Sequence, residues 1–256
     1  MKPKPKPKAK APAKRRGLGA YPRPSVTVDV VLLAAVPARS ALHALVVRRS
    51  EPPFGGRWAL PGGFVGIDEP LDAAARRVVR EKARLADVFM EQLYTFGSPR
   101  RDPRGRVITV AYYALVDEAR FRQAAAEAKG EVAVARLDVG WEGETGGPVD
   151  VVSEHESGAA LPLLLAFDHG EIVGMAVKRL RGKLDYTPVG FQLLPPSFTL
   201  RQLQDVHETV LGRPLNKDSF RRRILASGLL DATGERQDDV DHRPAELYRF
   251  GRQSAT

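Results

Sequence analysis

Cysteine is missing from this sequence, although the chain is 256 residues long. Disulfide bonds and thiolate metal sites are therefore excluded, and a reducing compartment is allowed. Long apolar runs are missing as well, and none approaches the roughly 20 residues that a membrane-spanning helix requires. The basic N-terminus is not followed by the apolar segment of a secretory signal. The sequence thus predicts a protein with no membrane partner.

Acidic residues are missing from the first 16 residues, which hold eight of the 40 lysines and arginines. The other 32 basic residues nearly balance the 31 acidic ones, so the net charge of +9 resides in this tail. Alternating lysine and proline favour neither a helix nor a core, and we expect residues 1–20 to be extended and disordered. Such a tail either tethers nucleic acid through counterion release or only improves solubility, and the sequence leaves both open.

The body of the chain is long enough for one or two domains with a sizeable core. Residues 25–36 read SVTVDVVLLAAV, a β-branched run typical of a buried strand. Further strands are predicted at 41–48, 92–97 and 106–116, and helices at 70–83, 118–129 and 168–184. Asp168 and Glu171 have the spacing of a capping box. Residues 131–158 have no clear assignment.

The C-terminal part has the order of a winged helix-turn-helix. Three prolines in residues 186–196 mark a boundary, and helices are predicted at 199–211 and, after Asn216 as N-cap, at 217–226. Two strands at 229–232 and 246–250 follow. We expect the second helix to turn Phe220, Ile224 and Leu225 inward and its arginines outward, into the major groove. The alternative is an accessory or dimerisation domain whose arginines are only solvated.

Residues 60–85, LPGGFVGIDEPLDAAARRVVREKARL, predict a strand, a glycine turn, a loop and a helix. Pro70 suits the first turn of that helix. The segment resembles the Nudix box, the loop-helix element with which Nudix hydrolases hold metal ions on a diphosphate. The residues that fit the pattern are Gly63, Glu69, Arg77, Val79, Glu81 and Leu85.

Three positions of the box depart from the family pattern. Val78 and Lys82 stand where metal-binding glutamates are expected, and Arg84 stands in place of a glycine. Positions 78, 81 and 82 share one helix face, and in the family their carboxylates attract Mg²⁺. Glu69 and Arg77, which in the family tie the loop to the helix, are present. The resemblance implies a preserved cradle for a diphosphate with poor or absent metal catalysis.

The whole chain resembles the Nudix-related transcriptional regulators of NAD metabolism, the NrtR family. The segments that carry the resemblance are 55–65, 102–112, 165–169, 179–188, 193–225 and 243–250. It implies an α/β fold, a Nudix α/β/α sandwich followed by a C-terminal winged helix-turn-helix domain. The expected parts are a basic tail (1–20), a ligand-sensing domain (21–165), a linking helix and junction (166–190) and a DNA-binding domain (191–252).

The resemblance also implies a function. We expect a DNA-binding regulator, a repressor of NAD metabolism genes, whose degraded Nudix domain senses ADP-ribose or a related nucleotide and then releases DNA. It would be no enzyme, require no cofactor, bind double-stranded operator DNA as a homodimer and reside in the cytoplasm with the nucleoid. The alternative is an active Mg²⁺-dependent pyrophosphatase of ADP-ribose with an accessory C-terminal domain.

Candidate site residues follow from these patterns. Those expected at the ligand are Arg57, Trp58, Gly62, Gly63, Glu69, Arg77, Glu81, Lys82, Arg104 and Arg106. Those expected at DNA are Lys217, Ser219, Arg221, Arg222, Arg223 and Arg243. The acids Asp238, Asp239 and Asp241 are expected at the wing tip, away from the DNA backbone, because acids near phosphates oppose DNA binding. Open alternatives are a core role for Trp58, a solvated Glu81, a Lys82 that points to solvent, and a His169 that caps or packs instead of relaying ligand state.

Overall fold

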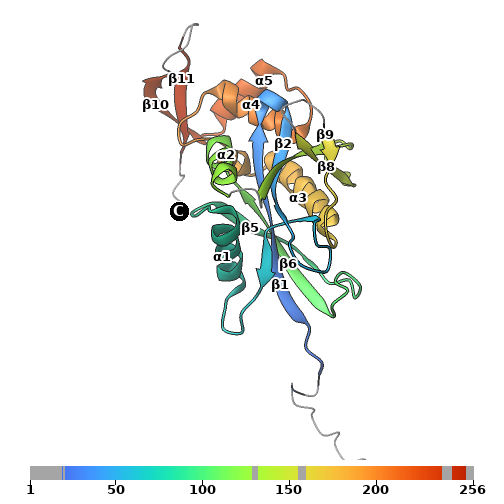
Figure 1. The fold of residues 1–256 in the computed structure, drawn as a ribbon. Coiled ribbons are helices and arrows are strands. Elements are labelled where there is room, and N and C mark those ends of the chain that lie inside the picture. The colour runs from blue at the N-terminus through green and yellow to red at the C-terminus, as the bar shows by residue number, and fades with distance from the viewer. Residues whose placement is uncertain (1–18, 20, 129–131, 155–159, 238–243, 252–256) are drawn as a thin grey trace, which may run out of the picture.

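A mixed sheet with helices on both faces forms the larger part of the molecule (Figure 1). The computed structural model describes residues 19, 21–128, 132–154, 160–237 and 244–251. The strand order is β5-β6-β1-β2-β7-β8-β9, with β3 paired to β2 and β4 to β1. The strands are β1 (Ser25–Val36), β2 (Ala41–Arg48), β3 (Trp58–Ala59), β4 (Gly62–Phe64), β5 (Phe89–Phe96), β6 (Val107–Leu115), β7 (Val132–Val139), β8 (Val149–Glu154) and β9 (Ala160–Pro162).

Helices flank this sheet and continue into the C-terminal part. They are α1 (Leu71–Ala83), α2 (Glu118–Glu127), α3 (His169–Leu184), α4 (Leu200–Leu211) and α5 (Lys217–Ala226), with short 3-10 turns η2 (Pro37–Arg39) and η3 (Pro188–Leu193). A separate hairpin of β10 (Leu230–Arg236) and β11 (Glu246–Phe250) forms the wing. None of the helices in the described ranges has the length and apolarity to cross a bilayer.

The central strand β1 explains how the two layers form. Its side chains alternate between the faces, so Val28 and Val30 belong to one core and Val31 and Leu33 to the other. Helices α1 and α2 cover the first face, and α3, η3 and α4 cover the second. Because both faces are covered, β1 reads as a continuous apolar run from Val30 to Val36 instead of an alternating one.

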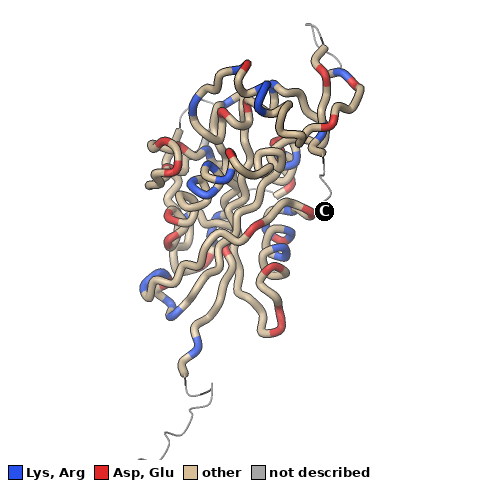
Figure 2. The backbone as a smooth tube through the Cα atoms, turned by 180° about the vertical axis from the view of Figure 1, so that it is seen from behind, with Lys and Arg blue, Asp and Glu red and all other residues tan. Residues whose placement is uncertain are grey.

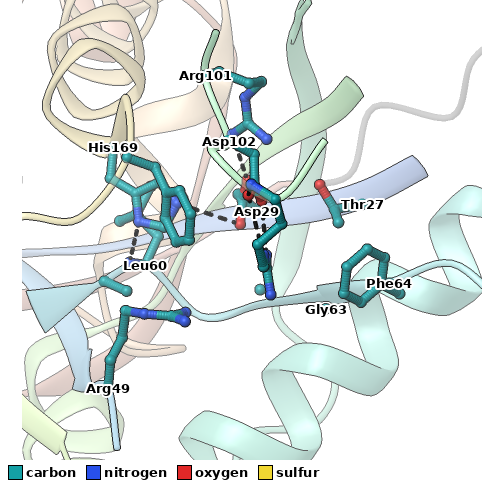
Figure 3. Close-up of a pocket in the computed structure, with 13 residues that line it drawn as sticks. Thr27, Asp29, Arg49, Leu60, Gly63, Phe64, Arg101, Asp102 and His169 are labelled. Atoms are coloured by element: carbon teal, nitrogen blue, oxygen red, sulfur yellow. Dashed lines mark hydrogen bonds and ion pairs between the residues drawn. The ribbon is translucent and has the colours of Figure 1, made fainter. Parts of the chain in front are cut away.

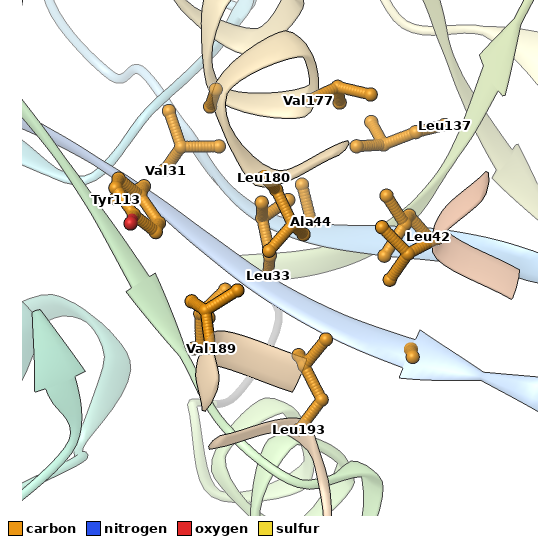
Figure 4. Packing of buried hydrophobic residues seen from close by; sticks show 14 of the residues in the cluster. Val31, Leu33, Leu42, Ala44, Tyr113, Leu137, Val177, Leu180, Val189 and Leu193 are labelled. Carbon is orange, nitrogen blue, oxygen red and sulfur yellow. The ribbon is translucent and has the colours of Figure 1, made fainter. Parts of the chain in front are cut away.

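The second core extends from the sheet into the winged helix. In Figure 4, Leu180 of α3 lies over Leu33, and the same buried cluster continues to Phe220, Ile224 and Tyr248 of the C-terminal part. Helix α4 contacts β1 and β2 directly. The predicted domain bounds stay a prediction, but α3 is a buried layer of the sandwich and not a free linker.

Several sequence predictions match the structure residue for residue. The bounds of β1, β2 and α5 are as predicted, and Asn216 caps α5 by accepting a hydrogen bond from Ser219 N at 2.9 Å. Residues 132–139 and 149–154, which had no assignment, form β7 and β8. The sequence pattern therefore identified the helices of both parts and the strands β1, β2, β5 and β6, but it missed β7 and β8 of the main sheet.

Three local predictions were wrong. The glycines at 62 and 63 lie in strand β4, not in a turn. Asp168 makes no capping hydrogen bond to α3, because Arg101 engages its carboxylate; the capping box lies at α4, between Thr199 and Gln202. Leu225 is 45% exposed, because it lies 100° round the helix from the buried Ile224. The basic tail, Arg243 and the acids Asp238, Asp239 and Asp241 lie outside the described residues.

Candidate functional site

A cavity of about 190 Å³ lies between β1, β4 and the start of α3, and we call it the Gly62 cavity. Gly62 is required there because the Cβ of any other residue would clash with the Asp29 carboxylate. At Gly63 a Cβ would lie 3.2 Å from Cγ2 of Val78. The titratable side chains that line the cavity are Asp29, Arg49, Arg101, Asp102, Arg104 and His169 (Figure 3).

A buried charge network forms the floor of this cavity. The Arg101 guanidinium donates to both oxygens of Asp168, at 2.8 and 2.7 Å, and its Nη2 lies 3.3 Å from Oδ2 of Asp29. The side chain of Arg101 is only 3% exposed. A guanidinium that bridges two buried carboxylates fixes their positions, since removing any partner leaves an uncompensated buried charge. The network thus joins β1, the loop before β6 and the start of α3.

His169 ties the segment between β3 and β4 to the network. The N–H of Leu60 donates to its Nδ1 at 2.9 Å, and its Nε2 lies 3.6 Å from Oδ1 of Asp29. Burial lowers the pKa of His169, an effect that outweighs the opposing influence of Asp29 and Asp168. The ring is therefore neutral, and because Nδ1 accepts a hydrogen bond its proton resides on Nε2, facing Asp29.

Two phenylalanines with left-handed backbones stand near the cavity. Phe54 and Phe167 have φ of 63° and 55°, and their rings meet edge to face at 5.0 Å. Such conformations cost about 1–3 kcal/mol each and cluster at functional sites. Phe167 lines the cavity, and the Arg49 guanidinium lies 4.9 Å from its ring centre.

Two polar groups in the cavity wall have bonding capacity to spare. Thr27 is 9% exposed, and its buried hydroxyl oxygen finds no hydrogen-bond partner in the described part of the chain. Arg49 donates to the carbonyl oxygens of Pro53 and Glu51, and no described carboxylate pairs with it. Buried polar groups normally have partners, so both groups are available to a ligand.

The predicted tie between loop and helix is present in the structure. Nε and Nη2 of Arg77 donate to Glu69 at 2.7 and 2.9 Å, and Nη2 also donates to the carbonyl of Phe64 at 3.0 Å. The Arg77 hydrogen bonds lower the pKa of Glu69 to about 2. Glu81 approaches the same guanidinium at 3.4 Å. Both glutamates of the box therefore form ion pairs with Arg77.

Lys82 lies in a second hollow, the Lys82 groove, of about 180 Å³. The groove adjoins the Gly62 cavity, with which it shares Arg49, Ala59, Leu60 and Gly62. Val78, one turn earlier on the same face of α1, is buried against Gly63 and belongs to the core under the helix. Arg84 ends α1 in a left-handed conformation, φ 55°, where a glycine fits without strain.

The structure thus brings together only part of the predicted ligand set. Gly62, Gly63 and Arg104 line the cavity, and Lys82 lines the groove. Trp58 packs against the core, in line with the alternative considered for it. Arg57 stacks over Phe54 at 5.2 Å, and Arg106 donates to the carbonyl of Gly97; neither lines the two hollows.

Sequence reasoning missed the acidic centre of the site. Asp29 interrupts the apolar run of β1, and a carboxylate within a buried strand is a signal that could have been read. Its partner Arg101 is 72 residues away. No spacing rule relates two such positions, so the pair becomes apparent only in the fold.

Helix α5 carries a cluster of basic residues, and the backbone in Figure 2 is coloured at Lys and Arg positions. Phe220 and Ile224 are buried against the core, which places Arg222 on the opposite side. The predicted contacts Lys217, Ser219, Arg221, Arg222 and Arg223 are all exposed. Lys217 and Arg221 also line a groove between α4, α5 and the wing, together with Arg201 and Arg236.

Helix α3 connects the two sites. Its N-terminal end carries Asp168 and His169 at the cavity, and the helix packs against α4 of the C-terminal part. Buried Arg181 donates to the carbonyl of Val210 in α4 at 2.8 Å. Asp185, which follows α3, lies 3.8 Å from Arg223 of the basic helix. Helix α3 is thus in direct contact with the cavity at one end and with the winged helix at the other.

A Nudix-type sandwich carrying a winged helix with an exposed basic helix defines a class of two-domain proteins. Models of the NUDIX domain and of the NrtR DNA-binding winged helix domain match residues 24–142 and 190–250. The chain belongs to the NrtR family, because a relative from Acinetobacter baylyi, the "ADPR responsive transcriptional repressor NtrR", is 36% identical over 91% of this chain and 84% of its own.

Solved structures agree with this assignment. NrtR of Shewanella oneidensis in complex with a 27mer DNA superposes with a TM-score of 0.70 at 34% identity, covering 88% of this chain and 93% of that one. The chain is also similar to an ADP-ribose pyrophosphatase of Methanocaldococcus jannaschii, 35% identical over 92 residues, which are 36% of this chain and 51% of that protein. The similarity to that enzyme is confined to part of the chain.

Proposed function

We propose that this protein is a transcriptional repressor of NAD metabolism genes, which binds operator DNA and releases it when ADP-ribose or a related nucleotide binds. One observation carries the proposal. A single chain combines an exposed basic helix in a winged helix with a Nudix frame whose metal-binding face has lost two carboxylates. The Acinetobacter relative, similar along nearly the whole chain, is described as an ADPR-responsive repressor.

The DNA-binding surface is the outer face of α5. Its N-terminal half enters the major groove, and Arg222 faces the groove because it lies opposite the buried side. Most contacts of Lys217, Arg221 and Arg223 would be to phosphates, since phosphate contacts predominate in such interfaces. Arg243 stays a candidate wing contact. A cytoplasmic homodimer would present two copies of α5 to two half-sites.

The effector would occupy the Gly62 cavity and the adjoining Lys82 groove. Arg49 supplies positive charge, the Thr27 hydroxyl supplies a hydrogen bond, and Phe167 supplies an aromatic face. Arg104 also lines the cavity, but its guanidinium is already paired with Asp102 at 2.7 Å. Two joined hollows suit an elongated ligand with a charged centre. Such a site would suit a nucleotide with a diphosphate, and Val78 and Lys82 offer no carboxylate at two positions where the family pattern has glutamates.

The ligand signal would pass along α3. A ligand that engages Asp29 or Arg101 pulls on Asp168 and His169, and so on the end of α3. Helix α3 is buried, and its Arg181 donates a hydrogen bond to α4. It would therefore move as a rigid body and shift α5. The ligand displaces DNA only if it prefers one arrangement of these helices.

A fluorescence anisotropy titration tests the function. Labelled promoter fragments of NAD metabolism genes should bind more tightly than random DNA, and ADP-ribose should reverse the binding. His169→Asn keeps an acceptor for the Leu60 N–H but loses Nε2. It should bind DNA and ADP-ribose separately while weakening their mutual antagonism. Promoter DNA that binds no better than random DNA would refute the repressor function.

An active pyrophosphatase is the second candidate, favoured by the intact Glu69–Arg77 pair and by the Methanocaldococcus relative. It predicts release of AMP from ADP-ribose in Mg²⁺ or Mn²⁺. The buried Val78 makes a glutamate there costly, so Lys82→Glu alone is the cleaner restoration. Turnover by the Lys82→Glu variant but not by the wild type would rule out the hypothesis that the natural protein is an active pyrophosphatase.

A further inference from the structure

The box helix does not fit the divalent metal that the Nudix fold implies. The side chain of Val78 is buried against Gly63, where it has no oxygen to offer. Glu69 and Glu81 both face Arg77, and neither lines the cavity or the groove. Among the residues that the structure describes, no three His, Cys, Asp or Glu side chains gather into a metal-binding group. Mg²⁺ requires such oxygen ligands.

Positive side chains gather around the groove beside the box helix. Arg48, Arg49 and Lys82 line the groove, against a single carboxyl, Glu51. Lys82 and Arg48 have no carboxylate partner among the described residues, and Arg49 bonds only to carbonyl oxygens. Three basic groups around one small hollow attract an anion with more than one charge, such as a diphosphate.

Lys82 is placed to reach such an anion. It lies one turn beyond Val78 on the same face of α1, and lines the groove beside Pro61 and Gly62. An ammonium group is a compact charge with three donors, which suits phosphate oxygens on any side. A neighbouring guanidinium, that of Arg49, borders both hollows.

We propose that Lys82, with Arg48 and Arg49, replaces the divalent cations of hydrolytic relatives and binds the diphosphate of the effector directly, without metal. This inference rests on the proposed function, because it concerns the effector of that same site. It has two consequences. The response of the repressor does not depend on the Mg²⁺ concentration, and no metal-activated water is available to cleave the bound nucleotide.

Calorimetric titration of the full chain with ADP-ribose tests the proposal, once in EDTA and once in millimolar Mg²⁺. The wild type should bind with the same affinity in both. Lys82→Ala should bind about tenfold or more weakly in both, because a charge-assisted hydrogen bond is lost. Lys82→Arg should retain metal-independent binding, since it keeps the charge.

A charge reversal gives the sharper readout. Lys82→Glu should lose ADP-ribose binding in EDTA and regain part of it in Mg²⁺, because a carboxylate on this face repels the diphosphate until a cation bridges them. The matched control is Arg80→Glu, the same charge change on an exposed position of α1 that lines neither hollow. It should bind as the wild type does. Circular dichroism of each variant establishes that it is folded.

Each outcome decides a different question. Wild-type binding that requires Mg²⁺ overturns the proposal and leaves the repressor function intact, and so does Lys82→Glu binding in EDTA as tightly as the wild type. If the wild type binds no ADP-ribose in either buffer, the proposed effector is wrong, and inorganic pyrophosphate serves as the probe. Pyrophosphate binding in EDTA that Lys82→Glu abolishes supports the cation site; no binding overturns it.

Discussion

Arg101 and Arg222 are both arginines at a candidate functional site, yet their surroundings are opposite. Arg101 is buried between Asp29 and Asp168, whereas Arg222 is exposed on α5 and has no carboxylate partner among the described residues. The first arginine has its charge satisfied inside the protein, and so it fixes geometry. The second leaves its charge for a partner molecule. The difference separates an arginine that holds distant segments together from one whose charge is open to solvent.

Breaking the buried region should have the largest effect. Arg101→Met leaves two carboxylates buried without a cation, and we expect a loss of about 3–5 kcal/mol in the free energy of unfolding. Urea denaturation measures it. The exposed neighbour Arg100→Met is the control and should change stability little. Equal stability of the two variants would mean that the network is not what holds α3.

Breaking the exposed region should affect DNA and not stability. Arg222→Ala should weaken operator binding about tenfold, since one charged contact is lost. If that contact is to a phosphate, the slope of log affinity against log salt should fall by about one. Anisotropy at several salt concentrations gives both quantities. Arg76→Ala on α1 removes an equal charge far from α5 and should leave DNA binding unchanged.

Lowering the pH should destabilise the protein through buried His169, which holds its proton less readily in the folded chain than in the unfolded one. Burial lowers the pKa of His169 below its ordinary 6.5, so the unfolded chain takes up the proton first. Stability is then complete above about pH 6.5 and falls as the pH drops below it. His169→Asn should make this fall shallower, and buried His207 should leave a remainder. Denaturation midpoints between pH 5 and 8 measure it.

The smallest effect is expected where an ion pair is exposed. Asp185→Asn breaks the 3.8 Å contact with Arg223. The Asp185 side chain is 65% exposed and that of Arg223 is 55% exposed. Surface pairs contribute about 0–1 kcal/mol, so the melting temperature should hardly move. A shift as large as that of Arg101→Met would contradict the distinction between the two regions.

The regular elements could be predicted because their signals are local. The apolar run of β1 and the N-cap Asn216 each act within a few residues, and the box glycine, Glu69 and Arg77 have a fixed spacing. The cavity could not be predicted, because its parts come from distant segments. Phe54 and Phe167 meet only in the fold, and so do Leu60 and His169, which are 109 residues apart. Burial and backbone strain there depend on tertiary packing.

The hydrogen bond from Leu60 to His169 has a spectroscopic consequence. A ring locked with its proton on Nε2 gives two well-separated ¹⁵N resonances, one for the protonated nitrogen and one for the bare Nδ1. The Nε2–H points toward Asp29 at the cavity, whereas Nδ1 faces the backbone of Leu60, between β3 and β4. The ¹⁵N signals of this imidazole therefore report on two places separately. The Nε2 signal would respond to a ligand near Asp29, and the Nδ1 signal would respond to movement of the Leu60 backbone.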